Sequence, residues 1–170
     1  RKAKNEPMDK LKISSPRRLK GRIMLPASKS ISGRALVINA LSRSPLLPEN
    51  LSDSDDTQVL LHALQEMPPV IDIGAAGTAM RFLTAYYATR EGRHVRLGGS
   101  ERMSRRPIGP LVDALRALGA DIRYTAAEGF PPLDIRGTHL HGGELAIDGS
   151  VSSQFISALL MVAPLTTRRH

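Results

Sequence analysis

Serine, lysine and arginine side chains gather at the start of a segment that is otherwise apolar. This segment is Leu25–Leu41, LPASKSISGRALVINAL, and we expect its second part to be a helix. Its polar residues lie at the N-terminal end: Ser28, Lys29, Ser30, Ser32 and Arg34. The first N–H groups of a helix have no partner within the helix and carry partial positive charge. Hydroxyls and cations there predict an anion site, although Ser28 or Ser30 could instead serve only as the helix cap.

The same arrangement occurs twice more along the chain. Residues 75–81, AAGTAMR, precede the apolar run FLTAYYA, and residues 152–154, SSQ, precede the apolar run FISALLMVA. A helix without a polar stripe is normally buried. Three buried helices whose polar N-termini could gather around one place predict a repeat architecture that binds an anionic ligand.

A loop rich in arginine lies between the second and third of these helices. Arg102, Arg105 and Arg106 all fall within residues 98–106. Arginine binds phosphate and carboxylate groups through two parallel hydrogen bonds, so this cluster is a further candidate anion site. The alternative is a solvated loop in which Glu101 pairs with one of the arginines.

Metal and thiol chemistry find no support in the sequence. There is no cysteine, which excludes disulfides, thiolate metal ligands and a cysteine nucleophile. The five histidines show no metal-ligand spacing beyond His139-x-His141, which we expect in a solvated turn. We therefore expect neither a metal ion nor a cofactor.

The positive charge is concentrated at the N-terminus. The formal net charge is +8, and residues 1–22 contain nine lysines or arginines against two acidic residues. A basic arm could contact nucleic acid. However, this arm has no aromatic side chain to stack on bases, and we expect a solvated leader. No apolar segment reaches membrane-spanning length and no signal peptide is evident, so the expectation is a cytoplasmic protein without a membrane partner.

Periodicity and turn residues place further elements between the three helices. Asp53–Asp56 should open an amphipathic helix, where acidic residues suit the helix start, although they could instead have a role at the site. A second amphipathic helix should follow Pro107 and end at Gly119. Its core face should consist of Leu111, Val112, Leu115 and Leu118. Short strands are expected at residues 12–13, 21–25, 70–73, 94–97, 121–124, 133–136 and 144–147. The prediction is an α/β fold with a basic arm and first strand at residues 1–22 and repeated α/β units at residues 23–170.

Five stretches, in order along the chain, carry a resemblance to a known family. They are LPASKSISGRAL (25–36), SDSDDT (52–57), AAGTAMRF (75–82), SERMSRRPIGPLVDALRALGA (100–120) and SSQFISALLMVAPL (152–165). Together they resemble the 5-enolpyruvylshikimate-3-phosphate (EPSP) synthases, or 3-phosphoshikimate 1-carboxyvinyltransferases. The resemblance implies transfer of the enolpyruvyl group of phosphoenolpyruvate to the 5-hydroxyl of shikimate 3-phosphate, with release of phosphate. This transferase reaction belongs to chorismate and aromatic amino acid biosynthesis.

The resemblance also implies a fold. Family members consist of βαβαββ-type units with buried helices and outer sheets, an inside-out α/β barrel in which helix N-termini face a cleft between two domains. This chain would hold an incomplete part of both domains. The acid and base of the reaction would lie in the absent remainder, so the chain alone would be inactive. Small anionic substrates, no cofactor and a monomeric full-length enzyme follow from the same resemblance.

For phosphoenolpyruvate, the resemblance implicates Lys29, Gly77, Arg106 and Gln154. Lys29, the catalytic candidate, would touch both substrates. Gly77 would offer its backbone N–H to the phosphate, at a position where a Cβ would crowd the ligand. Arg106 would bind that same phosphate.

For shikimate 3-phosphate, the resemblance implicates residues of the first and third helices. Ser30 and Arg34 would hold the carboxylate side of the substrate together with Lys29, and their i, i+4 spacing places them on one helix face. Three residues at the start of the third helix would bind the 3-phosphate and lie beside the ring: Ser152, Ser153 and Gln154.

The chain departs from the family pattern near the phosphoenolpyruvate position. The family commonly has Asn where Ala75 stands and Pro where Phe82 stands. The span from Asp56 to Gly77 is short, as if part of a unit were trimmed. These departures predict an altered affinity for phosphoenolpyruvate and for glyphosate, the herbicide that competes there.

Two alternatives remain at the level of sequence. The sister enolpyruvyl transferase that acts on UDP-N-acetylglucosamine usually carries a reactive cysteine just before its Arg-Pro motif, where this chain has Ser100–Met103. The other alternative is a non-catalytic, basic nucleic-acid-binding domain.

Overall fold

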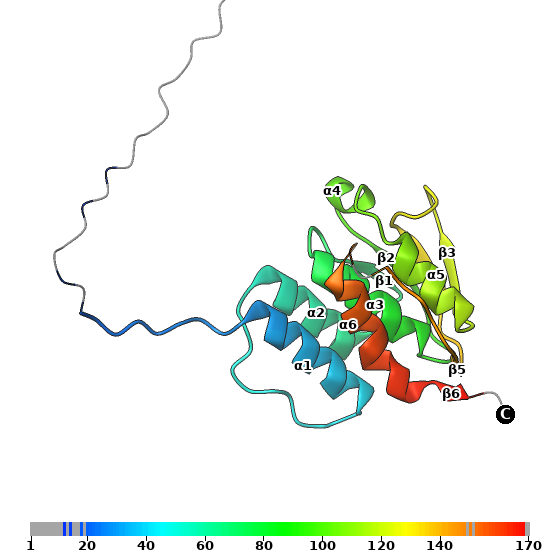
Figure 1. Ribbon diagram of the computed structural model, residues 1–170, viewed down its shortest axis with the longest axis horizontal. Coiled ribbons are helices and arrows are strands. Elements are labelled where there is room, and N and C mark those ends of the chain that lie inside the picture. Colours follow the sequence, from blue (N-terminus) through cyan, green and yellow to red (C-terminus); the bar gives the residue numbers. More distant parts are fainter. Residues whose placement is uncertain are drawn as a thin grey trace, which may run out of the picture.

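The computed structural model describes residues 12, 14, 18, 20–148, 150 and 152–168. In chain order the elements are α1 (Lys29–Leu41), α2 (Asp55–Glu66), β1 (Val70–Asp72), α3 (Gly77–Ala88), β2 (His94–Gly98), α4 (Glu101–Ser104), α5 (Gly109–Ala117), β3 (Asp121–Tyr124), β4 (Leu133–Arg136), β5 (His141–Gly142), α6 (Ser153–Val162), the 3-10 turn η1 (Ala163–Leu165) and β6 (Thr167–Arg168). Helices and sheet form separate layers (Figure 1). The mixed α/β class predicted from the sequence is confirmed.

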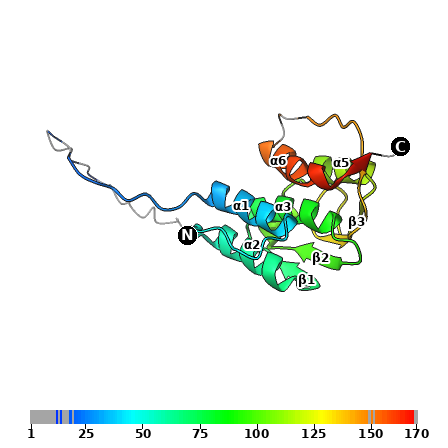
Figure 2. The same cartoon turned by 90° about the horizontal axis from the view of Figure 1, so that it is seen from below.

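A four-stranded sheet forms one layer, with the strand order β1-β2-β4-β3. Strands β1 and β2 are parallel, and the other neighbours are antiparallel. Val95 lies opposite Ile135 and Leu97 opposite Leu133, and all four side chains are buried. Because side chains alternate between the faces of a strand, these residues give the sheet one apolar face, which α3 covers (Figure 2).

Helix α3 is the centre of the core. All of its residues from Gly77 to Ala88 are buried, apart from the half-buried Thr78. The helix packs on β2 and β4 and contacts α1, α2, α5 and α6. A helix enclosed in this way needs an apolar surface all round, so the second predicted buried helix is confirmed.

Helices α1 and α6 differ from the prediction, because each buries only one side in this chain. Ile31 and Ile38 of α1 are 71% and 54% exposed, and Leu160 of α6 is 66% exposed. In α6 the buried residues are Phe155, Ala158 and Val162. Both helices pack against α3 and reach no further layer among the described residues, so the complete burial expected for them from composition is wrong here.

The two amphipathic helices are confirmed. Helix α2 begins with Asp55 and Asp56 in its first turn, where the helix dipole favours acidic side chains. Helix α5 has Pro110 in its first turn and is followed by Gly119 with a φ of +96°, a left-handed conformation that favours glycine. Its predicted core face is fully formed: Leu111, Val112, Leu115 and Leu118 are buried.

Of the predicted strands, those at residues 70–73, 94–97, 121–124 and 133–136 correspond to β1, β2, β3 and β4. Residues 21–25 and 144–147 form no strand. Residues 21–25 run away from the body of the protein (Figure 1). The strand of the region around residues 144–147 is β5, which precedes them and pairs with β6. A strand needs a partner for its backbone groups, and periodicity alone does not supply one. Lys12 is outside any strand, and Ile13 lies outside the described residues.

The loop predicted at residues 98–106 contains the single helical turn α4. Met103 is the one buried residue of this turn, and none of its surface is exposed to solvent. The buried Met103 side chain fixes the turn to the body of the protein. The three neighbouring arginines then extend from different positions around this turn.

Leu83→Ala tests the central position of α3. Removing a fully buried leucine should lower the free energy of unfolding by about 2–5 kcal/mol, since it costs the apolar transfer energy and leaves a cavity. The measurement is urea unfolding followed by circular dichroism. The matched control is Leu160→Ala on α6, which should change the stability by about 0.5 kcal/mol or less because that side chain is largely exposed. Equal losses for the two variants would contradict the assigned core.

Candidate functional site

The N-terminal ends of α1, α3 and α6 are joined by side-chain hydrogen bonds. Arg34 of α1 donates from Nη2 to Ser157 Oγ of α6 over 3.0 Å. Gln154 of α6 donates from Nε2 to Thr78 Oγ1 of α3, also over 3.0 Å. Lys29 borders a small cavity together with Thr78. The structure therefore brings residues from all three predicted polar helix starts together.

Two serines of these helix starts cap a helix, and two others are exposed to solvent. Ser28 Oγ accepts from the Ile31 N–H over 3.4 Å, and Ser152 Oγ accepts from the Gln154 N–H over 3.3 Å. The capping role considered for the first helix therefore belongs to Ser28. Ser30 and Ser153 are exposed residues in the first turns of α1 and α6.

Ser32, the remaining serine of the first polar start, has a structural role. It is buried, and its Oγ accepts from the Ser52 N–H over 2.9 Å. This bond fixes the segment before α2 to the start of α1. Because the residue is only 3% exposed, its hydroxyl does not reach a ligand outside the helix layer.

Lys29 has an acidic neighbour, Asp56, from the predicted helix start at residues 53–56. Its Nζ lies 3.1 Å from Asp56 Oδ1 on α2, and the lysine side chain is half exposed. The ion pair holds the ammonium group beside the start of α3. The signal in the sequence was the SDSDDT stretch, and within the described residues Asp56 is the one of its three carboxylates that pairs with a cation.

Arg34 is oriented by three contacts. Its Nη1 donates to the Ser30 carbonyl oxygen over 3.0 Å, and its Nη2 holds Ser157. Its guanidinium lies 5.5 Å from the centre of the Phe82 ring. Phe82 is one of the departures from the family pattern, and here it supplies an aromatic face to a predicted substrate-binding cation.

Two arginines lie together at the start of α3. A Cβ at Gly77 would lie 2.7 Å from Arg106 Cζ and 2.9 Å from Arg81 Nη1. Arg81 Nη1 donates to the Gly77 carbonyl oxygen over 2.7 Å. No carboxylate among the described residues pairs with either guanidinium. Two neighbouring cations without a counter-ion, beside a helix N-terminus, form a site that an anion would stabilise.

Arg81 is the residue that sequence reasoning missed. It is buried within an apolar helix, its guanidinium lies 5.3 Å from the centre of the Phe155 ring, and its Nε is buried without a hydrogen-bond partner. Burial, and secondarily the charge of Arg106, lower the pKa of Arg81 below its usual value. An arginine inside the run AMRFL is the only signal that could have revealed it.

The predicted arginine cluster of the loop is not a single site. Arg105 pairs with Glu101, and both side chains are largely exposed. Arg102 is exposed at the surface. Of the three, only Arg106 reaches the start of α3. The expected pairing of Glu101 with a neighbouring arginine is confirmed for Arg105, and an anion site at Arg106 stays a prediction.

The predicted solvated histidine pair lies away from these helix starts. The His139 and His141 rings make an edge-on contact with centroids 5.9 Å apart, and His139 Nδ1 lies 3.3 Å from Glu91 Oε1. In the part of the chain that the structure describes, no group of three potential ligands could hold a metal ion. Within that same part, every helix is too short or too polar to cross a bilayer.

Comparison with known proteins decides the family. A family described as "EPSP synthase (3-phosphoshikimate 1-carboxyvinyltransferase)" matches residues 13–70 and 66–169 of this chain. The chain belongs to the EPSP synthase family. A 3-phosphoshikimate 1-carboxyvinyltransferase from Bacteroides fragilis is 59% identical over 153 residues, which are 90% of this chain and 37% of that relative. One from Photobacterium profundum is 42% identical over 186 positions, covering 94% of this chain and 43% of the relative.

The fold agrees with a solved member of the family. The EPSP synthase from Acinetobacter baumannii superimposes with a TM-score of 0.73 at 22% identity, over 86% of this chain and 39% of that one. This chain therefore spans well under half the length of the relatives that it matches.

The shortened span predicted before Gly77 has a counterpart in these alignments. The two family matches meet at residues 66–70, between α2 and β1. The P. profundum alignment covers more positions than the 170 residues of this chain, so that relative has residues without a counterpart here. The B. fragilis alignment covers 153 positions, which is 90% of the 170 residues of this chain, so this alignment holds no such additional residues.

Gly77→Ala tests the contact between the start of α3 and Arg106. The new Cβ would overlap the ends of two flexible side chains and no backbone. We expect the free energy of unfolding to change by about 1 kcal/mol or less, while the Arg106 guanidinium moves away. The measurements are urea unfolding and the Nε–Hε resonance of Arg106 in nitrogen-15 NMR spectra. Gly21→Ala, where a Cβ meets nothing within 4 Å, is the control. An unmoved Arg106 resonance would show that the assigned contact is wrong.

Proposed function

We propose that this chain forms part of a 3-phosphoshikimate 1-carboxyvinyltransferase and supplies much of its anion-binding surface. The reaction transfers the enolpyruvyl group of phosphoenolpyruvate to the 5-hydroxyl of shikimate 3-phosphate and releases phosphate. The observation that carries the proposal is the convergence of Lys29, Arg34, Arg81 and Arg106 around the starts of α1, α3 and α6. Both proposed substrates carry a phosphate and a carboxylate, which this arrangement suits.

Shikimate 3-phosphate is proposed to lie between α1 and α6. Arg34 and Ser30, with Lys29, bind its carboxylate side. Residues at the start of α6 bind the 3-phosphate and the ring: Ser152, Ser153 and Gln154. The contact of Arg34 with Ser157 supports this division, because it holds the guanidinium against α6 before any ligand arrives.

Phosphoenolpyruvate is proposed to lie at the start of α3. The Gly77 N–H and Arg106 bind its phosphate, and Lys29 and Gln154 contact it from the two neighbouring helices. Arg81, held by the Gly77 carbonyl and the Phe155 ring, acts as a positioning residue for Arg106. The space that a Cβ at Gly77 would fill is the space into which the phosphate and the guanidinium must fit.

The chemistry needs two proton transfers that the described site does not supply. The methylene carbon of phosphoenolpyruvate must gain a proton, and the 5-hydroxyl must lose one. Among the described residues around Lys29, the carboxylate is Asp56, which already pairs with that lysine. The proposed contribution of this chain is therefore binding, orientation and charge neutralisation, and the chain alone is proposed to be inactive.

The remaining parts of the proposal rest on the resemblance. They are a monomeric full-length enzyme, a cytoplasmic location, and no cofactor or nucleic-acid partner. The names of the relatives favour the shikimate substrate over UDP-N-acetylglucosamine.

A chimaera tests the function directly. The matched 153 residues of the B. fragilis relative are replaced by this chain, and phosphate release is measured with both substrates. We expect turnover, and we expect Lys29→Met in the chimaera to lower it by roughly 10²-fold or more, as for the loss of a charged group at a reacting centre.

The matched control is Lys20→Met, an exposed lysine outside the site, which should leave turnover unchanged. Circular dichroism and urea unfolding establish that each variant is folded. A folded Lys29→Met chimaera with the turnover of its parent would refute the role of Lys29, and a folded chimaera that binds neither substrate would refute the proposed function.

A further inference from the structure

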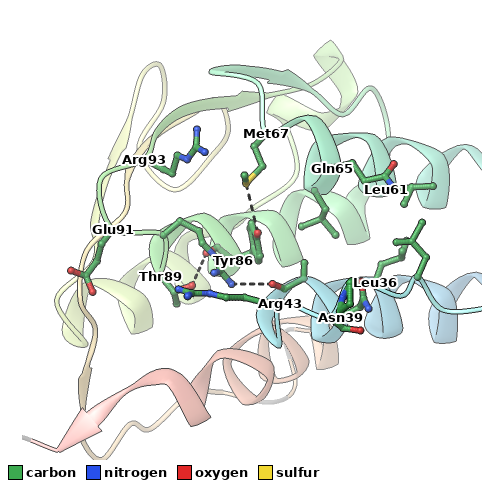
Figure 3. A pocket seen from close by; sticks show the side chains of 16 residues that line it. Leu36, Asn39, Arg43, Leu61, Gln65, Met67, Tyr86, Thr89, Glu91 and Arg93 are labelled. Atoms are coloured by element: carbon green, nitrogen blue, oxygen red, sulfur yellow. Dashed lines mark hydrogen bonds between the residues drawn. The ribbon is translucent and has the colours of Figure 1, made fainter.

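A second cavity lies at the C-terminal ends of α1 and α3, away from the polar helix starts. Its volume is about 670 Å³, within the range of roughly 300–1,000 Å³ typical of small-molecule sites. Figure 3 shows its lining residues on α1, α2 and the end of α3. No residue assigned above to either substrate lines it.

The base of the cavity is apolar. Leu47, Leu61 of α2 and Met67 contribute accessible aliphatic surface, whereas Leu36, Leu64 and the Tyr86 ring are buried. Tyr86 and Met67 point toward one another (Figure 3), with the phenol oxygen 3.9 Å from the methionine sulfur. A flexible methionine beside exposed leucine surface favours a ligand with an apolar group.

Three arginines line the cavity: Arg43, Arg90 and Arg93. The acidic residue of the lining is Glu91, whose carboxylate already lies against His139. No ion pair within the described residues neutralises any of the three guanidinium groups. The lining therefore has an excess of positive charge above an apolar base.

Arg90 is the most constrained of the three. Its guanidinium lies 4.4 Å from the centre of the Tyr86 ring, and its Nη2 donates to the Ala40 carbonyl oxygen at 3.5 Å. Its Nε is buried and has no hydrogen-bond partner. The ring and the carbonyl oxygen therefore fix the Arg90 guanidinium at the cavity wall without neutralising its charge.

Arg43 is held in an uncommon backbone conformation. Its φ is +56°, in the left-handed region that non-glycine residues seldom adopt. The conformation follows the end of α1 and places an exposed arginine on the cavity wall. A left-handed residue commonly follows the end of a helix, and here this turn sets the position of the Arg43 guanidinium beside the cavity.

The wall of the cavity includes the end of α2. Met67, with φ of +45°, ends α2 within residues 66–70, where the two family matches meet. The P. profundum relative has residues without a counterpart in this chain. The cavity is therefore bordered by the segment at which the two family matches meet.

We propose that this cavity binds a small aromatic carboxylate. The carboxylate lies between Arg90 and Arg43 and accepts hydrogen bonds from their guanidinium groups, and the ring lies on Leu47, Leu61 and Met67, apolar lining residues that keep exposed surface. Guanidinium groups suit a planar carboxylate because both can form two parallel hydrogen bonds. This site is independent of the proposed enzymatic function.

Phenylacetate is the probe, titrated into the 170-residue chain and followed by proton–nitrogen NMR. We expect saturable shifts for residues of the cavity, and binding weaker by about tenfold for the neutral phenylacetamide, because charged hydrogen bonds are lost. At the cavity, as followed by the shifts of its lining residues, inorganic phosphate should bind more weakly than phenylacetate, because it cannot use the apolar base. Saturable shifts confined to the starts of α1, α3 and α6, or none at all, would overturn the proposal.

Two variants locate the carboxylate. Arg90→Met and Arg43→Gln should each weaken phenylacetate binding by about tenfold, and Arg43→Gln decides the outcome if Arg90→Met proves unfolded. Arg96→Gln is the matched control, an exposed arginine of β2 outside the cavity, and should have no effect. Unchanged affinity in folded Arg43→Gln, or an equal loss in Arg96→Gln, would overturn the proposal.

Discussion

The enclosure of α3 is the constraint on which the rest of the structure depends. This helix packs on the sheet with one side and on α1, α2, α5 and α6 with the others. Close-packed interiors resist sliding and rotation, because either would open voids and expose apolar surface. The position of its first turn is therefore fixed, and with it the positions of Gly77, Thr78 and Arg81. Thr78 then holds Gln154, so the start of α6 is aligned with the start of α3.

The cations of the candidate site are held mainly by groups that do not neutralise them. Arg34 is placed by a carbonyl oxygen, a hydroxyl and the Phe82 ring, and Arg81 by a carbonyl oxygen and the Phe155 ring. Only Lys29 has a carboxylate partner. Cations oriented in this way keep their charge for an incoming anion, and their mutual repulsion falls when it binds. The second cavity repeats this principle with Arg90 over Tyr86.

Sequence reasoning predicted the polar starts of three helices, and hydrogen bonds between them confirm that they meet. It was less successful where the outcome depends on a partner. Apolar composition gave α3 correctly but overstated the burial of α1 and α6, since Ile38 and Leu160 have no covering layer among the described residues. Residues 144–147 alternate like a strand but found no neighbour. Arg105 and Arg106 are adjacent residues of the same type, so the sequence does not distinguish them. In the structure, Arg105 pairs with Glu101 and Arg106 lies at the start of α3.

The most direct test of the account is a calorimetric titration of this chain with shikimate 3-phosphate. If the starts of α1, α3 and α6 form one anion site, binding is saturable with one ligand per chain. Arg34→Gln then weakens it by roughly tenfold or more, the loss expected for a charged hydrogen bond, while Arg96→Gln leaves it unchanged. The absence of saturable heat from a folded chain, or the same affinity in folded Arg34→Gln, would contradict the central claim that these helix starts form a substrate site.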